Sequence, residues 1–308
     1  MIKNLYKIIN YLFIKISLIP LNLWLISSLV FILLRIAPGD PVDAILGSGA
    51  DKNAREILRS KLGLNDSLFQ QYINYVRDLI HLDFGDSLST QEPVISIIKE
   101  SLPSTIELGI ISIFIAICIG FPLGYLGLKN KNNKYDYFSR ILGISSYAIP
   151  PFWGAMMMQL TFSILLRIFP IGGQFSIFYD FPKVTGFLIL DSLIAQDLFA
   201  LKSAIYHLAL PSLTLGFLLS GVFSRSFRLN LEKAYKSDFI EAAITRGIKD
   251  RNIFINYALP NALLPILTIT GFAIASLAGG ALLIEVTFSW PGIALRLHEA
   301  ILQRDYTV

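Results

Sequence analysis

The chain has few residues of the kinds that build disulfide frameworks, metal sites or the charged surface of a soluble domain. Of its 308 residues 16% are charged, one is a cysteine and three are histidines. Soluble domains carry about 25% charged residues, so this composition does not fit one. The single Cys118 lies in an apolar run, which excludes a disulfide framework and a thiolate metal site, and we expect it to be a small buried hydrophobe.

Catalytic motifs are also missing from the sequence. There is no Gly-x-x-x-x-Gly-Lys-Ser/Thr phosphate loop, so ATP hydrolysis is not assigned to this chain. There is no His-Glu-x-x-His motif, and His81, His207 and His298 are too scattered to predict a zinc site, so we expect them at polar surfaces or interfaces. The cores of the long apolar segments contain no histidine, which argues against an intramembrane serine protease. We therefore predict no catalytic residue, no metal, no cofactor and no enzymatic activity of the chain itself.

What the chain does have is long apolar runs. Its residues are 54% hydrophobic and its mean hydropathy is +0.60. A helix that crosses the hydrocarbon core needs about 20 mostly apolar residues, and the segments that reach or approach this length are residues 16–36, 108–128, 141–166, 208–223 and 262–284. Backbone groups in lipid must be bonded internally, so these runs predict helices. The predicted fold class is an all-α membrane protein, a polytopic helical bundle with five spans, and we expect the fourth span to continue helically over residues 225–231.

The first apolar run does not have the features of a cleaved signal. Lys3, Lys7 and Lys15 precede it, as in a secretory signal. A signal's apolar region is roughly 7 to 15 residues long and ends in a small-residue cleavage site. Here the run continues to Ile36 without such a site. Residues 1–36 therefore predict an N-terminus and an uncleaved first transmembrane helix.

Basic residues set the predicted orientation. The net charge of +4 and the pI near 9.0 do not indicate nucleic-acid binding, because the basic residues cluster beside the apolar runs. The short loops at residues 129–140 and 225–251 are rich in Lys and Arg, so both should be cytoplasmic, with the N-terminus on the same side. Residues 37–104 then form an extracytoplasmic segment. Residues 105–308 form the core transmembrane domain, with a cytoplasmic loop at about 231–259.

Two regions outside the cytoplasm are patterned. Leu64-Asn65-Asp66-Ser67 offers helix caps, apolar residues recur at helical spacing over residues 68–80, and residues 94–98 form a second short amphipathic stretch. This segment is either a packed cap or a docking surface for a soluble substrate carrier, and composition favours neither. Residues 184–198 are apolar but contain Asp191 and Asp197. Because a charge near the bilayer centre costs several kcal/mol, we expect an external, partly buried or interfacial helix there rather than a further span.

The polar stretch between the fourth and fifth spans predicts two short helices. Ser237 or Asp238 can cap the first helix, and Asp238 with Glu241 forms a variant of the capping box. Gly247 is suited to the left-handed conformation that ends a helix. Asp250 can start the second helix, which leads into the fifth span.

The first of these helices is predicted to have one flat face. Phe239, Ala242, Ala243 and Arg246 fall on one side of it, and two alanines permit close approach of a partner. Such an elbow suits insertion into a groove of another protein. A cytosolic loop without a partner often contains a short amphipathic helix as well, so the spacing leaves both interpretations open.

Polar and helix-breaking residues inside the spans are candidates for a translocation path. On the third and fifth spans these are Ser145, Ser146, Tyr147, Pro150, Thr268, Thr270 and Ser276. Adjacent prolines bend a helix and expose carbonyl groups that a cavity or a neighbour must satisfy. The alternative is that small and hydroxylated residues simply allow helices to pack closely.

A series of motifs runs in order across essentially the whole chain. They are Arg35-Ile36-Ala37-Pro38-Gly39-Asp40-Pro41, Leu62-Gly63-Leu64, Asp83-Phe84-Gly85-Asp86-Ser87, Glu92-Pro93-Val94, Leu102-Pro103-Ser104-Thr105-Ile106-Glu107-Leu108, Ile149-Pro150-Pro151-Phe152-Trp153, His207-Leu208-Ala209-Leu210-Pro211, Glu241-Ala242-Ala243 with Gly247 and Leu259-Pro260, Phe288-Ser289-Trp290-Pro291-Gly292, and Arg304-Asp305-Tyr306. With these motifs the chain resembles the binding-protein-dependent ABC transporter permeases, and in particular the first permease subunit type of their dipeptide, oligopeptide and nickel branch.

This resemblance implies the transmembrane domain of a type I ABC importer that translocates peptides or a related small solute. It implies that the Glu-Ala-Ala segment couples to an ATPase subunit through Glu241, Ala242, Ala243, Arg246, Gly247, Leu259 and Pro260. The implied partners are a homologous second permease subunit, two ABC ATPase subunits, an extracytoplasmic solute-binding protein and membrane lipid, without nucleic acid. The implied location is a bacterial cytoplasmic (inner) membrane, and the implied mechanism is alternating access.

Other interpretations stay open at this point. The chain could serve an importer of nickel or another non-peptide solute, a secondary transporter, or a scaffold; a secondary transporter would need mid-membrane carboxylates, which the centres of the five predicted spans lack. The sequence specifies neither the substrate nor whether the permease pair is a homodimer. The family usually adds a sixth span after Arg-Asp-Tyr, whereas this chain ends at Val308, and we expect truncation. Ile244-Thr245 also departs from the family's usual sequence, on the variable face of the segment.

Overall fold

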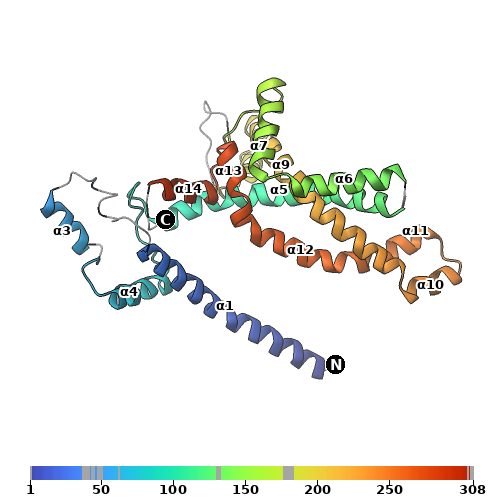
Figure 1. Ribbon diagram of the computed structural model, residues 1–308, viewed down its shortest axis with the longest axis horizontal. Coiled ribbons are helices and arrows are strands. Elements are labelled where there is room, and N and C mark those ends of the chain that lie inside the picture. Colours follow the sequence, from blue (N-terminus) through green and yellow to red (C-terminus); the bar gives the residue numbers. More distant parts are fainter. Residues whose placement is uncertain are drawn as a thin grey trace. The chain divides into compact units, whose positions relative to one another are not determined.

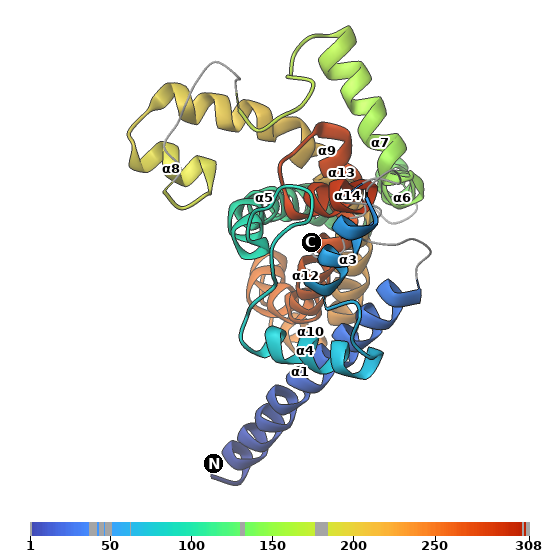
Figure 2. The same cartoon turned by 90° about the vertical axis from the view of Figure 1, so that its left-hand side faces the viewer.

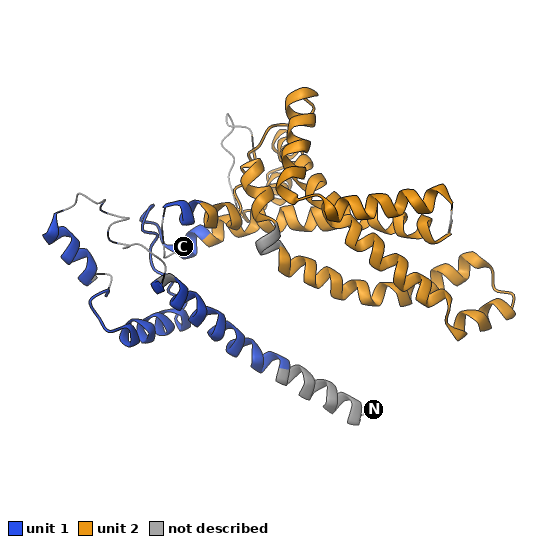
Figure 3. Ribbon diagram, viewed as in Figure 1, with its two compact units in different colours: residues 1–97, 299–308 blue, residues 98–298 orange. Residues whose placement is uncertain are grey.

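The structure is a computed structural model that describes the backbone of residues 2–36, 42, 46, 51–61, 63–129, 133–175, 184–303 and 305, and their side chains except at 2–14, 34, 61 and 277–280. Within these residues the elements are helices, and the only β pairing is an isolated bridge between Asp86 and Pro93. The predicted all-α class is therefore confirmed. The chain divides into two compact units, residues 1–97 with 299–308 and residues 98–298 (Figure 3).

The first unit is built on α1 (Ile2–Ile36), followed by α3 (Lys52–Lys61) and α4 (Leu68–Ile80) (Figure 1). Two tyrosines of α4 hold α1: the Phe31 ring lies 5.4 Å from the ring of Tyr72 and 5.3 Å from that of Tyr75. The hydroxyls of Tyr72 and Ser28 are 2.6 Å apart. The predicted helix over residues 68–80 is confirmed, with Ser67 as its N-cap accepting a hydrogen bond from the Gln70 amide.

Two of the sequence motifs meet within the first unit. The Ser87 hydroxyl donates to a carboxylate oxygen of Asp305 at 2.6 Å, across 218 residues of sequence. The amide and the hydroxyl of Ser89 donate to the same oxygen at 3.1 and 3.0 Å. Since Asp305 is buried, these bonds fix the turn after α4 to the last described residue. Residues 37–41, Arg304, Tyr306 and Val308 lie outside the described residues.

The second unit is organised around the long helix α9. Its elements are α5 (Val94–Lys129), α6 (Lys134–Ala148), α7 (Pro151–Met158), the π-helix η1 (Gln159–Leu165), α8 (Leu188–Ile194), α9 (Leu198–Tyr235), α10 (Asp238–Thr245), α11 (Asp250–Ile253), the π-helix η2 (Phe254–Ala258), α12 (Leu259–Gly280), α13 (Leu282–Phe288) and α14 (Ile293–Gln303). The first residues of α5, up to 97, and the last residues of α14, from 299, belong to the first unit. Helices α6, α7, α8, α12 and α13 all pack on α9. Figure 1 shows α5, α6, α9 and α12 running alongside one another, and Figure 2 shows α8 beside the first turns of α9.

Small residues set the close crossing of α5 and α9. A Cβ atom on Gly120 would lie 2.8 Å from the carbonyl oxygen of Ser220, and one on Gly124 would lie 2.7 Å from that of Ser224. Both pairs are spaced four residues apart, so they repeat along one stripe of each helix. Lipid provides no hydrophobic drive between helices, and close van der Waals packing of small residues replaces it.

Four helices of the described part are long and apolar enough to cross a membrane, or five if one bent pair is counted as a span. The four lie within residues 15–33, 94–129, 198–235 and 250–276. The predicted continuation of the fourth span beyond residue 225 is confirmed, because α9 runs to Tyr235. The predicted helix over residues 184–198 is only the seven-residue α8, which is too short to be a further span.

The predicted third span is not one continuous helix. Helix α6 ends at Ala148, α7 begins at Pro151, and the two directions differ by 105°. The residue before a proline disfavours helical geometry, and two consecutive prolines remove two backbone donors. The single helix predicted over residues 141–166 was therefore wrong, although the prediction that the prolines bend the chain is confirmed.

Three other expectations are corrected. Residues 94–98 form the first turn of α5, because Pro103 is accommodated inside this helix. The fifth span ends at Gly280, and Ile284 belongs to α13. Cys118 is exposed rather than buried, because it lies on the face of α5 opposite Ala116 and Gly120, which pack inward.

The crossing of α5 and α9 gives a stability prediction. Replacing Gly120 by valine forces side-chain atoms against the backbone of α9, and we expect a loss of about 1–3 kcal/mol in unfolding free energy. The measurement is thermal or denaturant unfolding in mild detergent. Gly271→Ala is the control: nothing lies within 4 Å of its added Cβ, so it should not destabilise the protein and, inside a helix, should stabilise it by up to about 1 kcal/mol. Equal stabilities of the two variants would contradict the close crossing.

Candidate functional site

The predicted docking helix is present as α10, but its predicted side-chain caps are not. Ser237 occupies the N-cap position, and its carbonyl accepts from the amides of Ile240 and Glu241 at 3.0 and 3.3 Å. Its hydroxyl instead turns back and donates to the carbonyl of Ala234. Among the hydrogen bonds described for this segment, none joins the carboxylate of Asp238 or Glu241 to the first turn, so the predicted capping box was wrong.

The end of α10 is a Schellman turn with Gly247 in the left-handed conformation, as predicted. The φ of Gly247 is +71°, its amide donates to Ile244 at 2.9 Å, and the amide of Ile248 donates to Ala243 at 3.2 Å. These are the two bonds that define the motif. The Ile248 side chain completes it by packing against the apolar cluster that contains Ala243. The turn is thus closed by both backbone bonds and apolar contact.

The two faces of α10 differ from the sequence prediction at one position. Ile240 and Ala243 are fully or almost fully buried, with 0% and 3% of their surfaces exposed. Phe239, Ala242 and Arg246 are exposed. Ala243 therefore faces the protein interior and does not belong to the predicted flat patch, because α10 has to bury one face against the helices beneath it.

The exposed surface of this elbow combines charge with apolar area. Besides the three residues just named, Glu241 and Ile244 are exposed, the latter by 58%. Gly247 at the turn is exposed as well. Leu259 and Pro260, which are also predicted to couple to the ATPase, are the first two residues of α12. Leu259 is half-buried and Pro260 is exposed. The exposed side of α10 thus combines aromatic, aliphatic and charged side chains.

The buried face of the elbow joins the ends of three long helices. Ile240, Ala243 and Ile253 share one apolar cluster with Leu231 and Ala234 of α9, Ala262 and Ile266 of α12, and Ile113 and Ala116 of α5. From α5, the Tyr125 ring lies 4.8 Å from that of Phe254. Displacement of the elbow therefore has to displace these helix ends.

The connection from the elbow to α12 is continuous. Asp250 begins α11 as predicted, and the chain then passes through η2 into α12 without a break. The wider turn of η2 immediately precedes Pro260, which has no amide hydrogen and whose ring conflicts with the carbonyl four residues earlier. The proline thus explains the local π-helix, and the predicted second helix is confirmed up to the start of α12.

The seven predicted path residues do not form one cluster. They lie on α6 and α12 and at the bend after α6, and α6 and α12 each pack along α9. Ser146 is buried where Gly143 of α6 crosses Gly221 of α9, and it donates to the Gly143 carbonyl. This placement is that of a packing residue.

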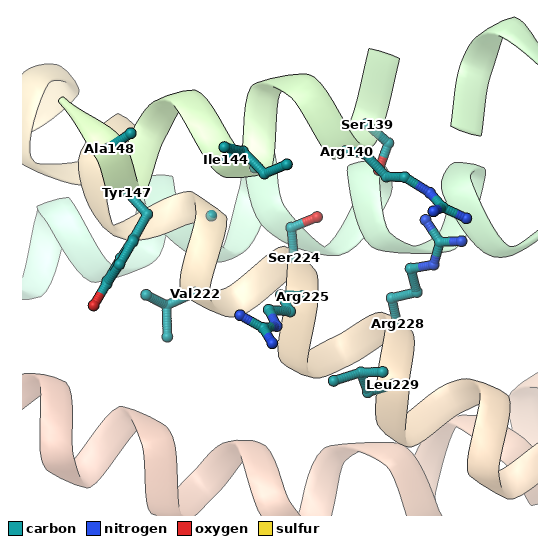
Figure 4. A pocket seen from close by; sticks show the side chains of 12 residues that line it. Ser139, Arg140, Ile144, Tyr147, Ala148, Val222, Ser224, Arg225, Arg228 and Leu229 are labelled. Carbon is teal, nitrogen blue, oxygen red and sulfur yellow. The ribbon is translucent and has the colours of Figure 1, made fainter. Parts of the chain in front are cut away.

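The remaining path candidates differ in exposure. Thr270 and Ser276 donate to carbonyls of their own helix at 3.0 and 2.9 Å, and Thr268 is exposed. Tyr147 is 78% exposed and lines a groove between α6 and α9 (Figure 4). Whether any of these residues contacts a solute stays a prediction.

That groove has a volume of about 750 Å³ and lies between residues 139–148 of α6 and 221–229 of α9. Arg140 and Arg228 converge at one end of it from the two helices (Figure 4). Both guanidinium groups bond to the buried carboxylate of Asp136. This ion-pair set joins the start of α6 to α9.

A second polar site was not identified from the residues themselves. The Leu102 to Leu108 motif contributes Ser104, whose carbonyl accepts from the Trp290 indole and whose hydroxyl accepts from Gln174, each at 2.9 Å. Glu107 accepts from the amides of Leu188 and Ile189 at 3.3 and 2.9 Å. The motif therefore ties α5 to α8 and to the segment after α13.

Glu285 is the central group of this junction between α5, α13 and α14. It is completely buried, accepts from the Thr105 hydroxyl at 2.7 Å and from the Leu295 amide at 3.0 Å, and Thr105 in turn accepts from the Ile293 amide. Gly292 packs directly on the carboxylate, where a side chain would clash. Burial raises the pKa of Glu285 above its usual value, against the opposing effect of these hydrogen bonds.

Asp191 holds the loop before α8 in a similar way. The Thr185 hydroxyl and the amides of Val184, Thr185 and Gly186 donate to its carboxylate. Burial alone would raise the pKa of Asp191, but these four bonds outweigh it, so the pKa lies below its usual value. One signal could have indicated both sites: a Ser, Thr, Asp or Glu inside an apolar stretch must find a partner when buried.

Comparison with known proteins assigns the chain to a family. The family of binding-protein-dependent transport system inner membrane components matches residues 112–308, and the family of the corresponding N-terminal component matches residues 8–109. The chain belongs to this transport family. It is a multi-pass membrane protein and a permease subunit of an ABC importer, as the motif series predicted.

Its relatives include named permeases of similar length. The chain is 32% identical to the di/tripeptide transport system permease protein DppB of Pseudomonas aeruginosa, over 92% of this chain and 84% of that protein. It is 36% identical to the probable D,D-dipeptide transport system permease protein DdpB of Escherichia coli, over 90% and 82%. It is 32% identical to the oligopeptide transport system permease protein AppB of Bacillus subtilis, over 92% and 84%.

The junction between α5, α13 and α14 gives a stability prediction for Glu285. Glu285→Ala leaves the buried Thr105 hydroxyl and the Leu295 amide without an acceptor, so we expect a loss of about 1–3 kcal/mol in unfolding free energy. Glu285→Gln keeps one carbonyl acceptor and should lose less. The measurement is the unfolding midpoint in detergent for the three proteins, and wild-type stability of the alanine variant would contradict the role of the carboxylate.

The same variants have a predicted pH dependence. Because the folded-state pKa of Glu285 is raised, its contribution to stability is fully present below its unfolded pKa and is lost as the pH rises through the folded pKa. Glutamine does not titrate there. Acidification from neutral pH toward the usual value of 4.5 should therefore stabilise the wild type relative to Glu285→Gln. A difference that stays constant with pH would show that the pKa is not raised.

Proposed function

We propose that this permease translocates peptides, delivered by an extracytoplasmic solute-binding protein, and that ATP hydrolysis on two separate ATPase subunits drives it. The names of the relatives support the substrate class, since each includes dipeptides, tripeptides or oligopeptides. The remaining partners in this proposal are a homologous second permease subunit and membrane lipid. The proposal assigns no catalytic residue, cofactor or metal to this chain.

The observation that carries the coupling mechanism is that one face of α10 is buried and the other is exposed. Its inner face packs on α9 and α11 within the apolar cluster that also contains residues of α5 and α12, and its outer face is exposed. We assign the ATPase contact to Glu241, Ala242, Arg246 and Gly247 on the exposed side. Ala243 positions the helix from below, and Leu259 with Pro260 transmits its movement into α12.

The proposed orientation places the N-terminus and the elbow in the cytoplasm. The support is the excess of Lys and Arg at residues 129–140 and 225–251, beside the apolar helices. The proposed division into residues 1–36, 37–104 and 105–308 follows this orientation. When the ATPases close, α10 moves and the attached helices tilt. The translocation cavity of the permease pair then opens alternately to the two sides of the membrane.

The transport function is tested by reconstitution. The complex with its second permease, ATPases and solute-binding protein is placed in proteoliposomes and supplied with labelled dipeptides and tripeptides. We expect uptake that requires both ATP and the binding protein. An ATPase-inactive partner is the control. Uptake by the permease pair without nucleotide, or ATP-dependent uptake of a non-peptide solute only, would contradict the proposal.

The coupling elbow gives a separate prediction at Gly247. Its φ of +71° is strained for a β-branched residue, although a Cβ atom there would meet nothing within 4 Å. Gly247→Val should therefore distort the turn and reduce ATP-dependent uptake by at least about tenfold, while membrane insertion persists. Gly247→Asn is the matched variant, because asparagine tolerates this conformation, and it should retain most transport.

Two measurements separate coupling from folding. Insertion is followed by the amount of complex recovered from the membrane, and coupling by the ratio of peptide transported to ATP hydrolysed. We expect this ratio to fall for Gly247→Val only. Normal transport by the valine variant, or an equal loss in both variants, would refute the role of the left-handed turn.

A further inference from the structure

The groove between α6 and α9 has a basic end and an apolar end. Arg140 and Arg228 converge at one end, Arg225 lies between them and Val222, and Tyr147 and Ala148 line the other end (Figure 4). The charged side chains are thus divided from the far end of the groove, which is lined by apolar and aromatic side chains. Such a division matches a ligand with one anionic end and one long apolar part.

The basic end carries an excess of positive charge. Arg140 and Arg228 share the one buried carboxylate of Asp136, so the three arginines outnumber the carboxylate that bonds to them. Glu232 on the next turn of α9 pairs with Lys236 at 3.0 Å, and its charge also acts on Arg140. The side chain of Arg225 is exposed and makes no ion pair with any residue that the structure describes.

The length of the groove matches one leaflet of a bilayer. It runs along residues 139–148 of α6 and 221–229 of α9, which at about 1.5 Å per residue is about 12–14 Å. Half of a hydrocarbon core of about 30 Å is about 15 Å. Arg140 lies about two turns from the start of α6 at Lys134, next to the basic loop, so the arginines lie near headgroup level.

The apolar end argues against a translocated peptide as the occupant. A peptide placed along Ile144 and Val222 would find no partners for its amides and carbonyls, and each unpaired group costs several kcal/mol. An acyl chain has no such groups. Guanidinium groups, in turn, are the side chains best suited to bind phosphate.

We propose that this groove binds one anionic phospholipid, whose phosphate contacts Arg225 and whose acyl chain lies against Ile144, Tyr147 and Val222. The site is independent of which solute the permease carries. Because the acyl chain fills the space between α6 and α9, its binding stabilises the spacing of these two helices. Helix α9 ends two residues before α10, so lipid occupancy and the coupling elbow act on the same helix.

The test uses the purified, delipidated transporter complex. Palmitoyl-oleoyl phosphatidylglycerol is titrated and bound lipid is counted by native mass spectrometry, with phosphatidylcholine of the same chains as the comparison. We expect one phosphatidylglycerol per chain at this site, and retention of phosphatidylcholine at least about tenfold weaker. Arg225→Gln should weaken phosphatidylglycerol binding about tenfold, the usual scale of one charge-assisted hydrogen bond.

Two further variants separate the site from general charge effects. Gly143 lines the groove, and a Cβ added there meets nothing within 4 Å, so we expect Gly143→Leu to occupy part of the groove and also to weaken lipid binding about tenfold. Lys233→Gln removes an exposed positive charge of α9 that does not line the groove, and it should bind lipid as the wild type does.

Several outcomes would overturn the proposal. They are unchanged lipid binding in both Arg225→Gln and Gly143→Leu, equal retention of the two lipids, and displacement of phosphatidylglycerol by millimolar glycerol phosphate, which would indicate a site for free phosphate. Val222→Cys is also introduced in a Cys118→Ser background. Crosslinking of this cysteine to the second permease in the lipid-saturated complex would show that protein, not lipid, covers the groove.

Discussion

The burial of one face of α10 is the constraint on which the coupling end of the molecule depends. An isolated helix shorter than about 12–15 residues is marginal in water, and α10 has eight residues. Its helical state therefore derives from packing. Removing a large aliphatic side chain such as Ile240 from water stabilises a structure by about 1.5–3 kcal/mol. The same contact that makes α10 a helix also attaches it to α9 and, through the shared apolar cluster, to residues of α12 and α5, so an elbow detached from this cluster would lose its structure.

The opposite end of the second unit is held by a different kind of interaction. There the buried carboxylates of Glu107 and Glu285 accept hydrogen bonds from backbone amides of α8 and α14 and from the Thr105 hydroxyl of α5. Charge-assisted bonds in a buried site are strongly directional, and a loss of one partner leaves the other uncompensated. Bending is consequently concentrated between the two fixed ends, at the break after Ala148 and at the π-helix before Pro260.

Much of the fold followed from sequence because it depends on local rules. Apolar length gave the long helices, the 3.6-residue spacing gave α4, and the demand for a positive φ gave the end of α10 at Gly247. What sequence did not specify depends on long-range contact. Ala242 and Ala243 are adjacent and chemically identical, so only the helices beneath α10 decide that Ala243 is the buried one. The partners of Thr105 and Glu107 are about 80 to 190 residues away, and no local spacing relates them. The bend after α6 could be placed from its prolines, but its angle is set by packing on α9.

The helices of this chain are held by forces that differ with depth. Between α5, α6 and α9, small residues such as Gly120 and Gly221 bring backbones together, because lipid tails are as apolar as the side chains they would replace. At the elbow, water surrounds the chain in the proposed orientation, and burial of Ile240 and Ile253 gains the hydrophobic free energy that the lipid-embedded part lacks. A force applied to the elbow thus meets a cohesive apolar cluster first and closely fitted but weakly attracted helices afterwards. The helices can therefore slide or tilt against one another while the elbow remains intact, which is the division of stiffness that transmission of movement from a partner subunit requires.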